Sequence, residues 1–136
     1  MSSAPRIPLP TQDIDVVRPP DTVRIVLYNT SHESLYFMSG TIKVEIDDHS
    51  VPSLGLNRYV QLFLEPGRHR LHLEHWDLLV FDNEYSINFM GSDVFMEVYC
   101  APTSTRFRRV DSLPPNFTAH YLPAVKNPYQ WATDDS

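Results

Sequence analysis

The chain has 136 residues, of which 42% are hydrophobic and 21% charged, so it has the length of one domain and enough apolar side chains for a buried core. Its formal net charge of -6 gives no general attraction for phosphate backbones, which disfavours nucleic acid as a partner. The single cysteine, Cys100, excludes an internal disulfide framework and a zinc site built from several cysteines.

The twelve prolines divide the chain, because five lie in residues 1–20 and five in 101–136. Proline cannot donate to a β ladder and breaks helix interiors. We therefore expect a proline-rich N-terminal arm over 1–20, a β domain over 21–100 and an extended C-terminal tail over 101–136. The first residues lack the basic and apolar regions of a secretory signal, and no stretch approaches the roughly 20 apolar residues of a membrane span. This predicts a cytoplasmic protein, or one whose signal has been removed.

Two early segments, 23–28 and 42–47, have apolar residues at every second position, the pattern of a strand with one buried face. The segment Asp47-Asp48-His49 supplies turn chemistry directly after the second strand. The apolar positions that define the two buried faces are Val23, Ile25, Leu27, Ile42, Val44 and Ile46.

The strongest hairpin prediction covers 58–75, where Pro66-Gly67 fits the centre of a type II turn between two apolar-alternating runs. Two more strands, 85–89 and 94–99, are joined by a short turn containing Gly91. Neighbouring strands joined by short turns are typical of antiparallel sheets. The sequence therefore predicts an all-β fold, a single antiparallel β-sandwich of Ig-like type with extended proline-rich N- and C-terminal tails.

Histidine and carboxylate residues gather in 69–77, where metal ligation is one interpretation. Strand alternation places His69 and His75 on one side and His72 on the other, which favours ordinary polar residues on a half-exposed strand. A metal-dependent enzyme using the His69/His72/His75 region stays as an alternative. No nucleophile elbow, HExxH pattern or Walker loop is present, so we predict no catalytic residue, no cofactor and no metal. Cys100 is expected to be a buried, inert thiol.

The tail contains a basic cluster and several aromatic residues among its prolines. The arginines can form a solvated linker, hold a phosphate or contact an acidic partner. The aromatics must pack, either on the domain's own sheet edge or on a second protein, because a solvated linker needs few of them. The residues predicted to bind a partner are Arg106, Arg108, Arg109, Phe117, Tyr121, Tyr129 and Trp131.

A ligand-binding alternative uses aromatic residues on a sheet face. Trp and Tyr stack on sugars and prefer half-exposed positions. Trp76, Tyr85 and His72 are the candidates for a small ligand or glycan.

Several segments recur in an order that is similar to a known family. These segments are Ile42 to Asp47, Val51 to Leu54, Tyr59, Leu64 to His69, the paired strands over 84–100, and Leu113 to Phe117. Together they resemble small bacterial envelope lipoproteins of unknown function that contain a PEGA-like β-sandwich domain. The resemblance implies a non-enzymatic domain in the cell envelope, tethered by an N-terminal lipid through a flexible arm, for which residues 2–20 are suited.

The sequence thus predicts a non-catalytic structural or protein–protein interaction module, an accessory subunit of a larger envelope assembly. Its partners would be other protein subunits, with no nucleic acid and no membrane span, and with a possible lipid tether. The location would be the periplasmic side of the cell envelope if a signal was removed, and the cytoplasm otherwise.

Overall fold

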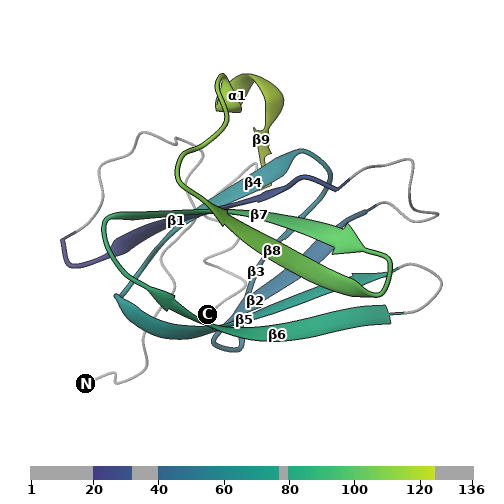
Figure 1. The fold of residues 1–136 in the computed structure, drawn as a ribbon, viewed down its shortest axis with the longest axis horizontal. Coiled ribbons are helices and arrows are strands. Elements are labelled where there is room, and N and C mark those ends of the chain that lie inside the picture. The colour runs from purple at the N-terminus through teal and green to yellow at the C-terminus, as the bar shows by residue number, and fades with distance from the viewer. Residues whose placement is uncertain (1–19, 32–39, 77–79, 125–136) are drawn as a thin grey trace.

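A computed structural model describes residues 20–31, 40–76 and 80–124, which form an all-β fold with one short helix (Figure 1). No helix in these ranges has the length and apolar character needed to cross a membrane. The elements are β1 (Val23–Asn29), β2 (Ile42–Ile46), β3 (His49–Leu54), β4 (Arg58–Leu64), β5 (Gly67–Trp76), β6 (Val80–Phe89), β7 (Asp93–Ala101), β8 (Ser104–Val110), α1 (Phe117–His120) and β9 (Leu122–Pro123).

The strands form two sheets, a five-stranded sheet in the order β8-β7-β1-β4-β9 and a four-stranded sheet in the order β3-β2-β5-β6. One apolar core combines side chains from both sheets, including the alternating residues predicted for 23–28 and 42–47. The prediction of an all-β class is therefore confirmed. The five-stranded sheet is mixed, because β7 runs parallel to β1 and β9 parallel to β4, which corrects the purely antiparallel prediction.

The predicted hairpin over 58–75 is wrong, because β4 and β5 belong to different sheets. β4 pairs with β1 and β9, whereas β5 pairs with β2 and β6. The Pro66-Gly67 turn is a corner that carries the chain from one sheet to the other, and Gly67 supplies its positive φ of 126°. The 85–89 and 94–99 segments behave in the same way, since β6 and β7 also lie in different sheets.

The hairpins that do form are β2–β3, β5–β6 and β7–β8. The turn predicted after β2 is confirmed, with φ of 51° at Asp47 and 68° at Asp48. Positive φ at both central residues is the signature of a type I′ turn, whose twist matches that of the two strands. Carboxamide and carboxylate side chains tolerate this left-handed conformation better than most.

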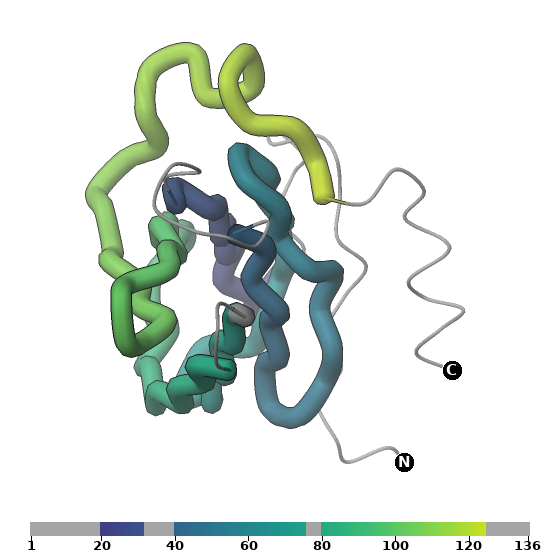
Figure 2. Tube along the Cα trace, turned by 90° about the vertical axis from the view of Figure 1, so that its right-hand side faces the viewer, coloured from purple at the N-terminus to yellow at the C-terminus, as the bar shows by residue number. Residues whose placement is uncertain are grey.

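The folded body continues past residue 100, where the sequence predicted the domain to end. β8 joins one edge of the five-stranded sheet, residues 113–121 then pass over the outer surface of that sheet, and β9 joins its other edge (Figures 1 and 2). β8 was missed because it is an edge strand with one fully buried residue, Thr105, and three exposed arginines. Such a strand lacks the apolar alternation by which buried strands are recognised.

Candidate interaction site

β8 is an edge strand with an open side. Among the described strands it pairs with β7 alone, in an unbroken register from Ala101↔Ser104 to Phe95↔Val110. In an antiparallel hairpin with two loop residues, the two residues that flank the loop form a hydrogen-bonded pair. The backbone N–H and C=O groups of Ser104, and of every second residue after it, therefore point to β7. The backbone groups of Thr105, Phe107 and Arg109 consequently point away from β7.

Thr105 joins this open side of β8 to β6 of the other sheet. Its N–H donates to Oδ1 of Asn83 at 2.8 Å, and its carbonyl accepts from the Tyr85 hydroxyl at 2.7 Å. Its hydroxyl donates to the carbonyl of Phe81 at 2.9 Å, so Nδ1 of His75, 2.6 Å from the same oxygen, must be the donor in that contact. Thr105 is fully buried, and its backbone and side chain are all engaged. These four bonds form a seam between the two sheets.

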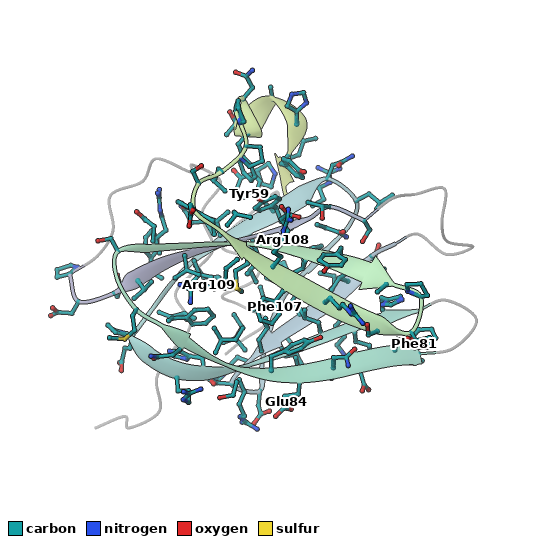
Figure 3. The ribbon with its side chains drawn as sticks, in the orientation of Figure 1. Tyr59, Phe81, Glu84, Phe107, Arg108 and Arg109 are labelled. Carbon is teal, nitrogen blue, oxygen red and sulfur yellow. The ribbon has the colours of Figure 1, made fainter. Side chains whose placement is uncertain are left out.

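After Thr105, the three arginines predicted as partner contacts lie on the two faces of β8. Register places Arg106 opposite Tyr99 and Arg108 opposite Glu97, on the outer face of the sheet. Arg109 alternates to the other side of the strand, the side on which Phe107 points between the sheets (Figure 3). All three side chains are exposed, so positive charge flanks the strand on both sides.

The arginines differ in their existing partners. Nη2 of Arg108 lies 2.7 Å from Oε2 of Glu97, and this hydrogen bond raises the pKa of the guanidinium above its usual value. Nε of Arg106 donates to the Ser104 hydroxyl at 2.8 Å. Within the ranges the structure describes, neither Arg106 nor Arg109 forms an ion pair with a carboxylate, so no described residue compensates either charge.

The aromatic residues of 113–124 pack on the domain's own sheet. Phe117 is 6% exposed, and its ring centroid lies 5.2 Å from that of Tyr28 and 5.1 Å from that of Tyr59. Tyr121 stacks on Phe117 at 4.8 Å. We call these four residues the aromatic cluster. The structure therefore uses Phe117 and Tyr121 within the domain, while Tyr129 and Trp131 lie outside the described residues.

Burial in the aromatic cluster changes the acidity of its tyrosines. Removal from water, together with the nearby charge of Glu97, raises the pKa of Tyr28 to about 12. The same two causes raise the pKa of Tyr121. The phenols therefore stay neutral under ordinary conditions, which suits a packed surface.

The three histidines of the metal alternative do not converge. His69 and His75 are buried, whereas His72 is half-buried on the opposite face of β5, as the alternation predicted. The Nδ1 atom of His69 contacts Oδ2 of Asp47 at 2.5 Å, and its Nε2 atom contacts the carbonyl of Glu65 at 2.8 Å. Both ring nitrogens of His69 are therefore already engaged by other residues of the fold.

Asp47 is held in its charged form by these neighbours. Burial alone would raise the pKa of its carboxyl, but a hydrogen bond from the backbone N–H of Arg70 at 2.9 Å and the contact with His69 outweigh it. The pKa of Asp47 is therefore lowered from its ordinary value of 3.8. This arrangement fixes the β2–β3 turn against the start of β5.

The predicted ligand-binding set is also divided between two faces. Tyr85 packs edge-on against Phe107 at 4.9 Å between the sheets, while His72 faces outward beside Glu45. The side chain of Trp76 lies outside the part of the molecule that the structure describes. His72 and Tyr85 therefore do not share a binding surface.

The residues that sequence reasoning missed are those of the seam, above all Thr105 and Asn83. No local pattern marks them, because each is a single polar residue in an unremarkable strand. A scan of protein-family models, a search of curated proteins and a search of solved structures each found no match to this chain.

Proposed function

We propose that the protein is a non-catalytic interaction module that binds an acidic, extended segment of a partner protein along the open side of β8. The observation that supports this most directly is the combination of an edge strand and uncompensated charge. Arg106 and Arg109 flank the strand from opposite sides and contact no described carboxylate. We propose no enzymatic activity for this chain.

The backbone supplies the first half of the recognition. Thr105 is already engaged by β6, so an incoming strand can begin its pairing at Phe107. The outward N–H and C=O groups of Phe107 and Arg109 are placed to pair with one such segment, as in strand addition to a sheet edge. Each backbone hydrogen bond contributes about 0.5–1.5 kcal/mol, so this short ladder alone binds weakly.

Charge supplies the second half. The strand carries three exposed arginines in a chain whose net charge is -6, so β8 is a basic strand in an acidic chain. Arginine forks match carboxylates in a bidentate geometry. The same charges repel a second copy of this strand, which disfavours self-pairing and favours a partner with alternating Asp or Glu.

The family that the sequence resembles also indicates where such a partner would be found. A partner that is another subunit of an envelope assembly, with this chain tethered by a lipid, agrees with the family that the sequence resembles. Tyr129 and Trp131, which lie outside the described residues, would then add aromatic anchors, as hot-spot residues of this type commonly do.

The test is capture of a partner from extracts of the native host, followed by affinity measurement with the purified partner. We expect the double variant Arg106→Glu/Arg109→Glu to bind at least ~10-fold more weakly, because charge reversal replaces attraction by repulsion. A matched control, Lys43→Glu/Arg68→Glu, reverses two charges on the four-stranded sheet and should change affinity by less than about 2-fold. Equal binding by both double variants, or no protein retained by the wild type, would contradict the proposal.

A further inference from the structure

The outer face of the four-stranded sheet carries a regular array of ionisable side chains. Register across β2, β5 and β6 aligns them in two rows, with the buried residues Leu71 and Leu73 on the other face of the sheet. Glu84 marks this outward side in Figure 3. We call the array the charged face. Its rows are Glu45–His72–Glu84 and Lys43–Glu74–Asp82.

Two carboxylates of the charged face stand directly opposite each other. Glu74 pairs with Asp82 across the β5–β6 ladder, where facing side chains lie about 4.5–5.5 Å apart and like charges repel. Two exposed arginines of β5, Arg68 and Arg70, lie on the same side of the sheet beyond the two rows. The rows themselves hold four carboxylates and one lysine, Lys43, whose Nζ lies 4.0 Å from Glu45. The local charge is therefore negative, and a bound cation would relieve the repulsion.

His72 completes a set of donors around these carboxylates. His72, Glu74 and Asp82 each offer one ligand atom, and these atoms all lie within 4.8 Å of one another. Two strands supply them, which the sequence alone could not indicate. Oε1 of Glu45 lies 3.3 Å from Nδ1 of His72 and can hold the ring while Nε2 carries a metal, the role that carboxylates have behind ligating histidines.

We propose that His72, Glu74 and Asp82 bind a divalent transition-metal ion, for which zinc is the best match. One imidazole and two carboxylates form a mixed nitrogen and oxygen donor set that suits zinc, whereas magnesium and calcium prefer oxygen ligands alone. Three protein ligands leave a position for water or for a group from a partner. The site lies on the other sheet from β8, so it stands independently of the partner-binding proposal.

The test is calorimetric titration of the full chain with zinc chloride near pH 7, with magnesium chloride titrated in parallel. We expect one zinc ion per chain and much weaker binding of magnesium. His72→Gln and Asp82→Asn should abolish saturable zinc binding, and Glu45→Gln should weaken it about 10- to 100-fold. Circular dichroism should show that these outward-facing substitutions leave the fold intact.

Matched controls keep the same residue types at positions outside the charged face. His120→Gln removes an exposed histidine of α1, and Asp111→Asn an exposed carboxylate after β8. Both should bind zinc as the wild type does, and the imidazole signals of His72 should shift on zinc addition in nuclear magnetic resonance spectra. The proposal is overturned if no saturable binding occurs, if His72→Gln still binds zinc, or if magnesium binds as tightly as zinc.

Discussion

The two sheets present outer faces of opposite character. On the five-stranded sheet, Tyr28 and Tyr59 are buried beneath Phe117 and Tyr121, which the chain's own residues 113–124 supply. On the four-stranded sheet, the charged face holds exposed groups such as Lys43, Asp82 and Glu84. Phe117 and Tyr121, although far along the sequence, therefore serve the fold, so among the described residues recognition has to be sought at charged and open positions.

The aromatic cluster should be the most sensitive part of this comparison. Phe117→Ala removes a side chain that contacts three tyrosines, and we expect the free energy of unfolding to fall by about 3 kcal/mol. Urea denaturation measures this loss. Thr118→Ala alters an exposed residue of the same helix and should change stability by less than about 0.5 kcal/mol. A loss below about 1 kcal/mol for Phe117→Ala would show that the aromatic cluster contributes little to the free energy of unfolding.

The seam between the sheets should come next. Thr105→Val keeps the shape of the side chain but leaves Nδ1–H of His75 and the carbonyl of Phe81 without the hydroxyl. Buried groups left in this way cost about 1–3 kcal/mol, so we expect a loss of about 2 kcal/mol in the same assay. Thr103→Val, in the exposed β7–β8 turn, is the matched control and should be near neutral. Equal stabilities for the two variants would contradict the assignment of the seam.

The turn that joins β2 to β3 should show a smaller, pH-dependent effect. The pKa of Asp47 is lowered in the folded state, so its stabilisation is present above the ordinary value of 3.8 and is lost as pH falls through the folded pKa. We expect Asp47→Asn to lose about 1 kcal/mol near pH 7, a difference that narrows below pH 3.8. Unfolding of both proteins measured at several pH values tests this, and a difference in stability that does not change with pH would contradict it.

Single charges on the charged face should matter least to folding. Glu84 is exposed, and exposed ion pairs contribute about 0–1 kcal/mol. Glu84→Gln should therefore leave the free energy of unfolding within about 0.5 kcal/mol of the wild type. A large loss would mean that this face contributes to stability as the aromatic cluster does.

Local pattern was sufficient for the all-β class, for β1 and β2, and for the Asp47-Asp48 turn, because each depends on neighbouring residues. It also separated His72 from His69 and His75, since strand alternation is a local property. Local pattern could not assign strands to sheets: Pro66-Gly67 has the same chemistry in a hairpin turn and in a corner between sheets. The seam needs contacts between Thr105 and residues of β6 that lie 20 to 24 positions earlier, which only the tertiary fold brings together.

The interaction proposal depends on the outward backbone groups of β8, and one pair of variants isolates them. Arg109→Ala and Arg109→Pro remove the same charge, but proline also removes the N–H that points away from β7. Proline is tolerated at such edge positions, so both variants should fold. With the purified partner, we predict that Arg109→Pro binds about 2- to 10-fold more weakly than Arg109→Ala. Equal affinities for the two variants would contradict strand addition at β8.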